Sequence, residues 1–197
     1  MPAAKQKNEL TQLINADFNS PQNLAFQKRV FTTYHAPAKP IVFLPCAAGK
    51  KRQKGLGYSQ CMTHQVMSII TKNPAIEKIV LSEPLVAVPY KFEREIPLYN
   101  YPPKLLTPND ETIFVNRTAQ FLTQLKQQEQ SRTIIYYVGG KHHADILEKA
   151  NKKANSPFNI KAYVASRMGY GRESKRLIQD MVCKTKPSNH YDCIEGL

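Results

Sequence analysis

The sequence lacks the long apolar stretches that mark membrane proteins and secretory leaders. No segment approaches the ~20 uninterrupted apolar residues that a membrane-spanning helix needs. The first residues, MPAAKQKNELTQ, also contain no apolar run of the signal-peptide kind. These absences predict a soluble, cytoplasmic protein without a membrane partner.

Acidic residues are scarce relative to basic ones. Asp and Glu number 15 against 28 Lys and Arg, which gives a formal net charge of +13. Because each neutralised phosphate releases a counterion, such a surplus favours a polyanionic partner. We therefore expect nucleic acid as the partner; the alternative is a basic charge that the protein simply tolerates.

Internal repeats and low-complexity tracts are absent as well. Hydrophobic residues make up 42% of the 197 residues, enough for the core of one ordinary domain. This composition excludes a wholly disordered chain and a disulfide-stapled miniprotein. We expect a polar N-terminal segment (1–20), a single domain (21–183) and a poorly ordered tail (184–197).

Short apolar runs alternate with amphipathic segments along the domain. Buried strands are predicted at 41–44, 78–82, 133–138 and 160–165. Helices are predicted from Pro21, after the basic loop 49–57, from Asn109 or Asp110, after Gly140 and over about 172–183. The proline-rich segment 83–110 is expected to be irregular and, with its tyrosines, functional. The alternation predicts an α/β fold in three layers, with a mostly parallel sheet flanked by helices.

In such sheets ligands bind beyond the carboxyl ends of the strands, which directs attention to Cys46. This thiol follows the first predicted strand and precedes Lys50 by four residues, inside a basic loop. Nearby cations favour the thiolate, the nucleophilic form of cysteine. The alternative is that Cys46 is a small buried hydrophobe and Lys50 a solvated surface charge.

A second group follows at regular spacing: Tyr58, Cys61 and His64. On a helix these positions share one face, where a phenol, a thiol and an imidazole could bind a polar ligand or move protons. As a metal site the group is incomplete, and a second half-site would have to come from Cys183, His190 and Cys193. Zinc sites show tighter ligand pairing, so we expect neither a metal nor a cofactor.

Polar residues also follow the other predicted strands. Glu83 could hold a ligand amine or a base edge, or act as a cap or salt-bridge partner. Gly139 and Gly140 precede a helix whose first N–H groups suit an anion, although the Walker spacing is absent. The neighbouring His142 and His143 should point to different sides of that helix, so at most one is expected to face the crevice.

The segment Gly169-Tyr170-Gly171-Arg172 follows the last predicted strand. It is interpreted as a flexible basic turn that either contacts phosphate or is simply a turn.

These residues resemble the core of archaeosine synthase, whose motif is Pro-Cys-x3-Lys-Pro-Tyr-x2-Ser-x2-His. The first half is matched by Pro45, Cys46 and Lys50, and the second by Tyr58 and His64. The chain departs from the motif at two places. Residues 51–57 stand where the family has one proline, and Cys61 replaces the serine.

The resemblance extends over about residues 20–165. Ser82-Glu83-Pro84-Leu85 with Val88-Pro89 is similar to the family's Ser-x-Pro-Leu-Gly-x-Val-Pro stretch, and Tyr101-Pro102 falls near its Tyr-Pro element. The family's transglycosylase-like barrel and tRNA-binding PUA domain have no counterpart here, so the resemblance implies a separate tRNA-binding subunit.

What the resemblance implies is a fold related to uracil-DNA glycosylases and the addition of L-lysine to the nitrile of preQ0 in tRNA. A radical-SAM partner would complete archaeosine. The catalytic residues would be Cys46, Lys50 and His64. The substrate would be bound by Pro45, Tyr58, Cys61, Ser82, Glu83 and Tyr101. The nucleic acid would be bound by Lys51, Arg52, Lys54, Lys141 and Arg172.

Two alternatives remain open. The altered motif is compatible with a non-catalytic nucleic-acid-binding module that has kept the fold. A related 7-deazaguanine-modifying activity on the free base or on DNA is the other.

Overall fold

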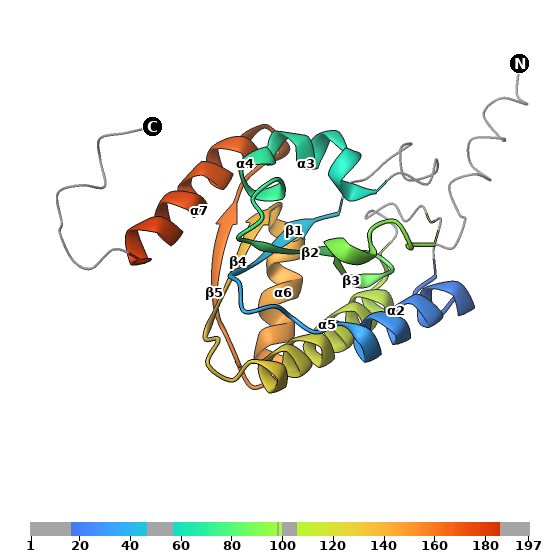
Figure 1. Ribbon diagram of the computed structural model, residues 1–197. Coiled ribbons are helices and arrows are strands. Elements are labelled where there is room, and N and C mark those ends of the chain that lie inside the picture. The colour runs from blue at the N-terminus through green and yellow to red at the C-terminus, as the bar shows by residue number, and fades with distance from the viewer. Residues whose placement is uncertain (1–16, 47–56, 98, 100–105, 186–197) are drawn as a thin grey trace, which may run out of the picture.

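The computed structural model describes residues 17–46, 57–97, 99 and 106–185. A sheet of five strands, in the order β3-β2-β1-β4-β5, runs through its centre (Figure 1). The strands are β1 (Ile41–Pro45), β2 (Glu77–Ser82), β3 (Val86–Pro89), β4 (Ile134–Gly139) and β5 (Asn159–Val164). Residues 1–16 and 186–197, which include most of the predicted tail, lie outside the described residues.

The predicted α/β class is confirmed, because β2, β1, β4 and β5 run parallel to one another. One strand was not expected. β3 pairs antiparallel with β2 inside the segment predicted to be irregular, and the 3₁₀ helix η4 (Tyr90–Phe92) follows it. The prolines around this strand had led to the prediction of an irregular segment. Pro89 is compatible with it because β3 is an edge strand, where a missing N–H can be tolerated.

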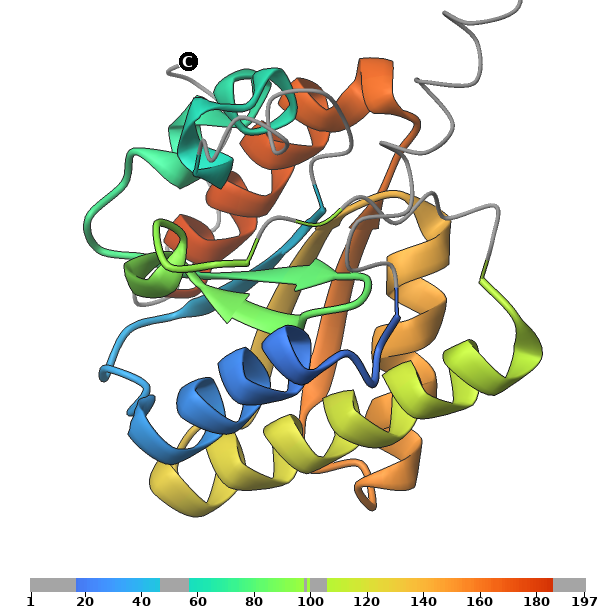
Figure 2. The same ribbon diagram turned by 90° about the vertical axis from the view of Figure 1, so that its right-hand side faces the viewer.

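Helices cover both faces of the sheet and complete three layers (Figures 1 and 2). One face carries α2 (Pro21–Thr33), α5 (Pro108–Gln128) and α6 (Lys141–Lys153). The other carries α3 (Met62–Val66), α4 (Ser68–Thr71) and α7 (Tyr170–Thr185). The 3₁₀ helices η3 (Tyr58–Gln60) and η6 (Arg167–Gly169) precede α3 and α7.

Two helix starts differ from the prediction. The cap of α5 is Thr107, whose hydroxyl accepts from the Asp110 backbone N–H while the Asp110 carboxylate accepts from Thr107. Asp110 is thus the partner in a capping box and not the cap itself. The predicted basic turn at 169–172 is also wrong in part, because Arg172 lies in the first turn of α7. The predicted start of α2 is confirmed, with Ser20 as its cap.

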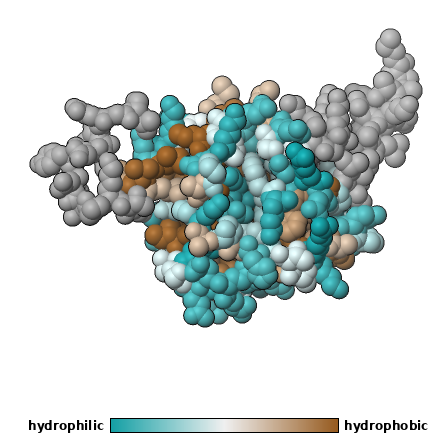
Figure 3. All heavy atoms as spheres, viewed as in Figure 1, coloured by the Kyte–Doolittle hydropathy of each residue, from teal (hydrophilic) through white to brown (hydrophobic). Residues whose placement is uncertain are grey.

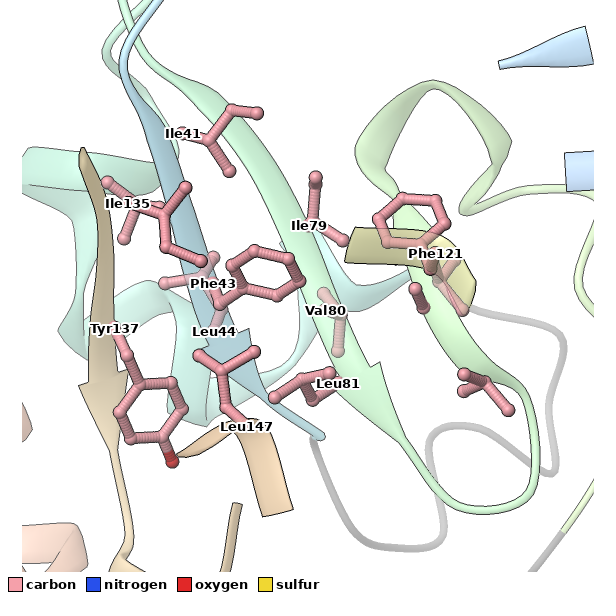
Figure 4. Close-up of a cluster of buried hydrophobic side chains, with 14 of the residues drawn as sticks. Ile41, Phe43, Leu44, Ile79, Val80, Leu81, Phe121, Ile135, Tyr137 and Leu147 are labelled. Carbon is pink, nitrogen blue, oxygen red and sulfur yellow. The ribbon is translucent and has the colours of Figure 1, made fainter. Parts of the chain in front are cut away.

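The hydrophobic core lies between the sheet and its helices. Figure 4 shows apolar side chains of β1, β2 and β4, including Phe43 and Leu81, packed with Phe121 of α5. Phe18 is also fully buried, with its ring centroid 5.6 Å from that of Phe114. The core therefore begins within the last residues of the segment expected to be polar.

The surface shown in Figure 3 is mostly hydrophilic. Hydrophobic residues gather on it beside α7, on which Val182 is one of the exposed apolar side chains. Within the described part of the chain, no helix combines the length and the apolar character that crossing a bilayer requires.

Candidate active site

The carboxyl ends of three parallel strands meet at one edge of the sheet. Pro45 of β1 pairs in register with Leu81 of β2, so Cys46 and Ser82 emerge side by side. Gly139 ends β4 at the same edge. A Cβ added there would collide with the Tyr137 hydroxyl and lie 3.0 Å from Pro45 Cδ, so only glycine fits this close approach. Parallel pairing thus gathers the first residues beyond each strand.

A thiol and three hydroxyl groups form a hydrogen-bonded cluster at this edge. The Cys46 Sγ atom lies 3.4 Å from Ser82 Oγ, which donates to it, and 3.3 Å from Tyr99 Oη. The Tyr99 hydroxyl also bonds to Ser82 and lies 2.8 Å from the Tyr58 hydroxyl. We call Cys46, Tyr58, Ser82 and Tyr99 the thiol–hydroxyl cluster.

The burial of this cluster bears on its chemistry. Tyr58, Ser82 and Tyr99 are buried, whereas Cys46 is only half-buried. Hydroxyl donors aimed at a sulfur stabilise a thiolate by charge-assisted hydrogen bonds, and these are stronger away from water. The cluster can therefore support a nucleophilic sulfur and pass a proton along its hydroxyls.

His64 is fully buried, and its ring contacts Pro45, the residue that precedes Cys46. Its Nε2–H donates to the Pro45 carbonyl oxygen at 2.9 Å, so Nδ1 is the acceptor for the Tyr90 hydroxyl. Burial raises the pKa of Tyr90, and nearby Glu93 raises it further, so this phenol keeps its proton. The imidazole also stacks between the rings of Tyr58 and Tyr90. These contacts hold the end of β1 in place. Both ring nitrogens are engaged in hydrogen bonds within the protein, so neither points to a ligand.

Cys61 is buried at the N-cap position of α3. Its thiol donates to the Gly57 carbonyl oxygen at 3.6 Å. A serine hydroxyl, the group found here in the motif that the chain resembles, could make the same bond. The Cys61 thiol and the His64 imidazole thus bond to different backbone carbonyls, those of Gly57 and Pro45. Cys183 is exposed and forms no disulfide, and His190 and Cys193 lie outside the described residues.

Glu83 is almost fully buried, at 1% exposure, and bonds to two histidines of α6. Its Oε1 accepts from His142 Nε2 at 2.7 Å, and its Oε2 accepts from His143 Nε2 at 2.9 Å. The expectation that these two histidines point to different sides of the helix is therefore wrong. The two ring centroids lie 5.1 Å apart, because both side chains lean toward the same carboxylate.

The protonation of this group follows from its contacts. Burial alone would raise the pKa of Glu83, but the charge of His143 and the two imidazole hydrogen bonds outweigh it, so the pKa lies well below its ordinary value. The hydrogen bond to Glu83 raises the pKa of His142, against the opposing effect of burial. Glu83 is therefore an ionised carboxylate, and an amine bound there would have to compete with two imidazoles.

The remaining predicted site residues are divided between the described and the undescribed parts of the chain. Lys141 and Arg172 are exposed in the first turns of α6 and α7, and Arg172 contacts Glu173 at 3.2 Å. The other predicted residues lie outside the described ranges: Lys50, Lys51, Arg52, Lys54 and Tyr101.

Two tyrosines belong to the site although no role was predicted for either one. Tyr99 joins the cluster, and Tyr90 holds His64. The only sequence signal was their presence in the proline-rich segment after Glu83. Their partners lie 17 to 53 positions away in the sequence, so local patterns could not identify them.

The fold and site define an α/β protein with a thiol centre at the carboxyl edge of a mostly parallel sheet. The chain belongs to DUF5591, a domain family of unknown function whose sequence profile matches residues 24–171. That range includes the thiol–hydroxyl cluster, His64 and the Glu83 group. No curated protein and no solved structure matches the chain at a significant level.

Proposed function

We propose that this protein is a tRNA-modifying enzyme of the archaeosine synthase type, which adds the side-chain amine of L-lysine to the nitrile of preQ0 in tRNA. One observation carries the proposal. Cys46 and Tyr58 belong to opposite halves of the interrupted motif, yet both bond to the hydroxyl of Tyr99. His64, also of the second half, bonds to Pro45 of the first. The insertion at 51–57 therefore leaves these motif residues together.

The chemistry of a nitrile suits this arrangement. In the first step the Cys46 thiolate attacks the nitrile carbon, a C–S bond forms, and one π-electron pair moves to the nitrogen. A hydroxyl of the cluster, Tyr99 or Ser82, supplies the proton that this nitrogen takes up. The product is a thioimidate on Cys46, and no oxidant or reductant is needed.

In the second step the neutral amine of lysine attacks the same carbon. The C–S bond breaks, the electron pair returns to the Cys46 sulfur, and the amine loses a proton to the hydroxyl that gave one before. The result is an amidine, and the sum of both steps is addition of an N–H bond across the nitrile. Lys50, assigned from the motif, would stabilise the thiolate by its charge.

The residues around the reacting centre have supporting roles. His64 is a positioning residue, because it acts through the Pro45 carbonyl and the ring of Tyr58. Lys141 and Arg172 lie on α6 and α7, whose first turns follow the strand ends, and would contact tRNA phosphates together with Lys51, Arg52 and Lys54. A partner that binds tRNA would supply further affinity, and a radical-SAM partner would act on the product.

Labelled L-lysine and tRNA carrying preQ0 test the proposal. We expect incorporation by the wild type, none by Cys46→Ser, and unchanged incorporation by Cys183→Ser, since Cys183 is an exposed thiol. Circular dichroism confirms that the variants fold. Absence of incorporation, alone and with a tRNA-binding subunit added, would contradict the proposal.

Lys50→Ala separates an enzyme from a nucleic-acid-binding module. An enzyme should lose turnover while its tRNA affinity stays nearly intact. A binding module should lose some affinity in every assay and show a shallower dependence on salt. Titration with free preQ0 base against preQ0-tRNA distinguishes an activity on the free base.

A further inference from the structure

The group formed by Glu83, His142 and His143 has no part in the two reaction steps above. It lies at the same edge of the sheet as the thiol–hydroxyl cluster, because Glu83 directly follows Ser82 in the chain. One oxygen or nitrogen from each of the three side chains lies within 4.8 Å of the others. Glu83 follows the end of β2, and the two histidines lie at the start of α6, so the fold itself brings the three side chains together.

Two imidazoles and one carboxylate are a common ligand set for divalent transition metals. Zinc binds imidazole nitrogen and carboxylate oxygen at about 2.0–2.2 Å, and catalytic sites use three protein ligands and one open position. Both Nε2 atoms here already point at the Glu83 oxygens. An ion would replace the two shared protons, and the carboxylate and both nitrogens would need only small shifts to reach it.

The burial pattern also suits a metal. The Glu83 carboxylate is held inside the protein, and buried charges in proteins are paired or bound to metals. The ring of His143 packs edge-on against Phe114, which fixes its orientation. The side chain of His142 is 41% exposed. An ion held here would therefore be anchored on its inner side and accessible on its outer side.

We propose that Glu83, His142 and His143 bind one divalent transition metal ion of the Zn²⁺ type, with an open position for water or substrate on the side of His142. This goes beyond the expectation from the sequence, which included no metal. It is independent of the reaction proposed above, since the ion can be measured without any tRNA. If that reaction is also correct, the ion lies next to the thiol centre and can act there as a Lewis acid.

The experiment uses the full chain without a polyhistidine tag, stripped with a chelator and titrated with Co²⁺ and with Zn²⁺. Wild type should bind one equivalent, with the visible absorption of Co²⁺ in a nitrogen and oxygen site. His142→Ala should bind at least about tenfold more weakly, because one ligand is gone. His142 is the variant of choice, since its exposed side chain can be truncated without emptying the core.

Two control variants test whether the metal binds to the group of Glu83, His142 and His143 and not elsewhere. His35→Ala removes an exposed histidine outside the group and should leave binding unchanged. Cys46→Ser should also leave it unchanged, and no thiolate-to-cobalt charge-transfer band should appear. The proposal is overturned if wild type binds no ion, if His142→Ala binds as well as wild type, or if the Cys46 variant loses the ion.

Discussion

The buried imidazole of His64 allows a quantitative test of its positioning role. His64→Leu removes the donor to the Pro45 carbonyl and the acceptor for the Tyr90 hydroxyl. Each buried group left without its partner costs about 1–3 kcal/mol, so the free energy of unfolding should fall by about 2–6 kcal/mol. That is a large part of the ~5–15 kcal/mol typical of a domain.

Tyr90→Phe alone should cost about 1–2 kcal/mol, because it removes one of these bonds. The double variant should be no less stable than His64→Leu, since the phenol that was left without an acceptor is now absent. The double-mutant cycle should therefore show a coupling of about 1–2 kcal/mol.

Urea unfolding followed by far-ultraviolet circular dichroism measures these values, as the chain contains no tryptophan. His35→Leu, at an exposed site, is the control and should change stability by less than about 0.5 kcal/mol. Strictly additive losses in the cycle would refute the hydrogen-bonded pair and with it the positioning role of His64.

Three further predictions concern the scaffold. Burial raises the pKa of Tyr34 and of Tyr137 above the ordinary 10.0, so their contribution to stability is complete below pH 10 and is lost as the pH rises above it. Unfolding free energy should then fall by about 1.4 kcal/mol per pH unit for each, and Tyr34→Phe should show a shallower alkaline slope in urea titrations; an unchanged slope would contradict this. Gly139→Ala should cost about 1–3 kcal/mol through the clash with the Tyr137 hydroxyl, measured by thermal unfolding, and a neutral result would show that the strand end can shift. Thr107→Ala should cost about 1 kcal/mol by removing the cap of α5, whereas Thr112→Ala, on the exposed face of the same helix, should cost less.

The sequence predicts most of the scaffold because its signals are local. The apolar runs at the positions of β1 and β4 are continuous, as expected for strands with both faces covered. Cys46 and Ser82 were placed correctly at strand ends for the same reason. β3 was missed because its apolar residues lie between prolines, which usually interrupt strands.

The partners within the site could not be read from the sequence, because they depend on contacts between distant segments. Tyr99 reaches Cys46 over 53 positions, and His143 reaches Glu83 over 60. Helical periodicity separates His142 from His143, yet both lie near the start of α6, where a single carboxylate beyond β2 attracts both rings. Spacing predicts a common face only when the partner lies on a neighbouring turn.

The most direct test of the reaction is the covalent intermediate on Cys46. The protein is incubated without lysine, with preQ0 base and with an RNA that carries preQ0, and its intact mass is then measured. The mass should rise in the wild type by that of one ligand molecule, either the free base or the whole RNA, with at least one of the two ligands, and lysine should remove the adduct. Cys46→Ser should show no increase. An unmodified wild type, or an adduct that persists in Cys46→Ser, would contradict the assignment of Cys46 as the nucleophile.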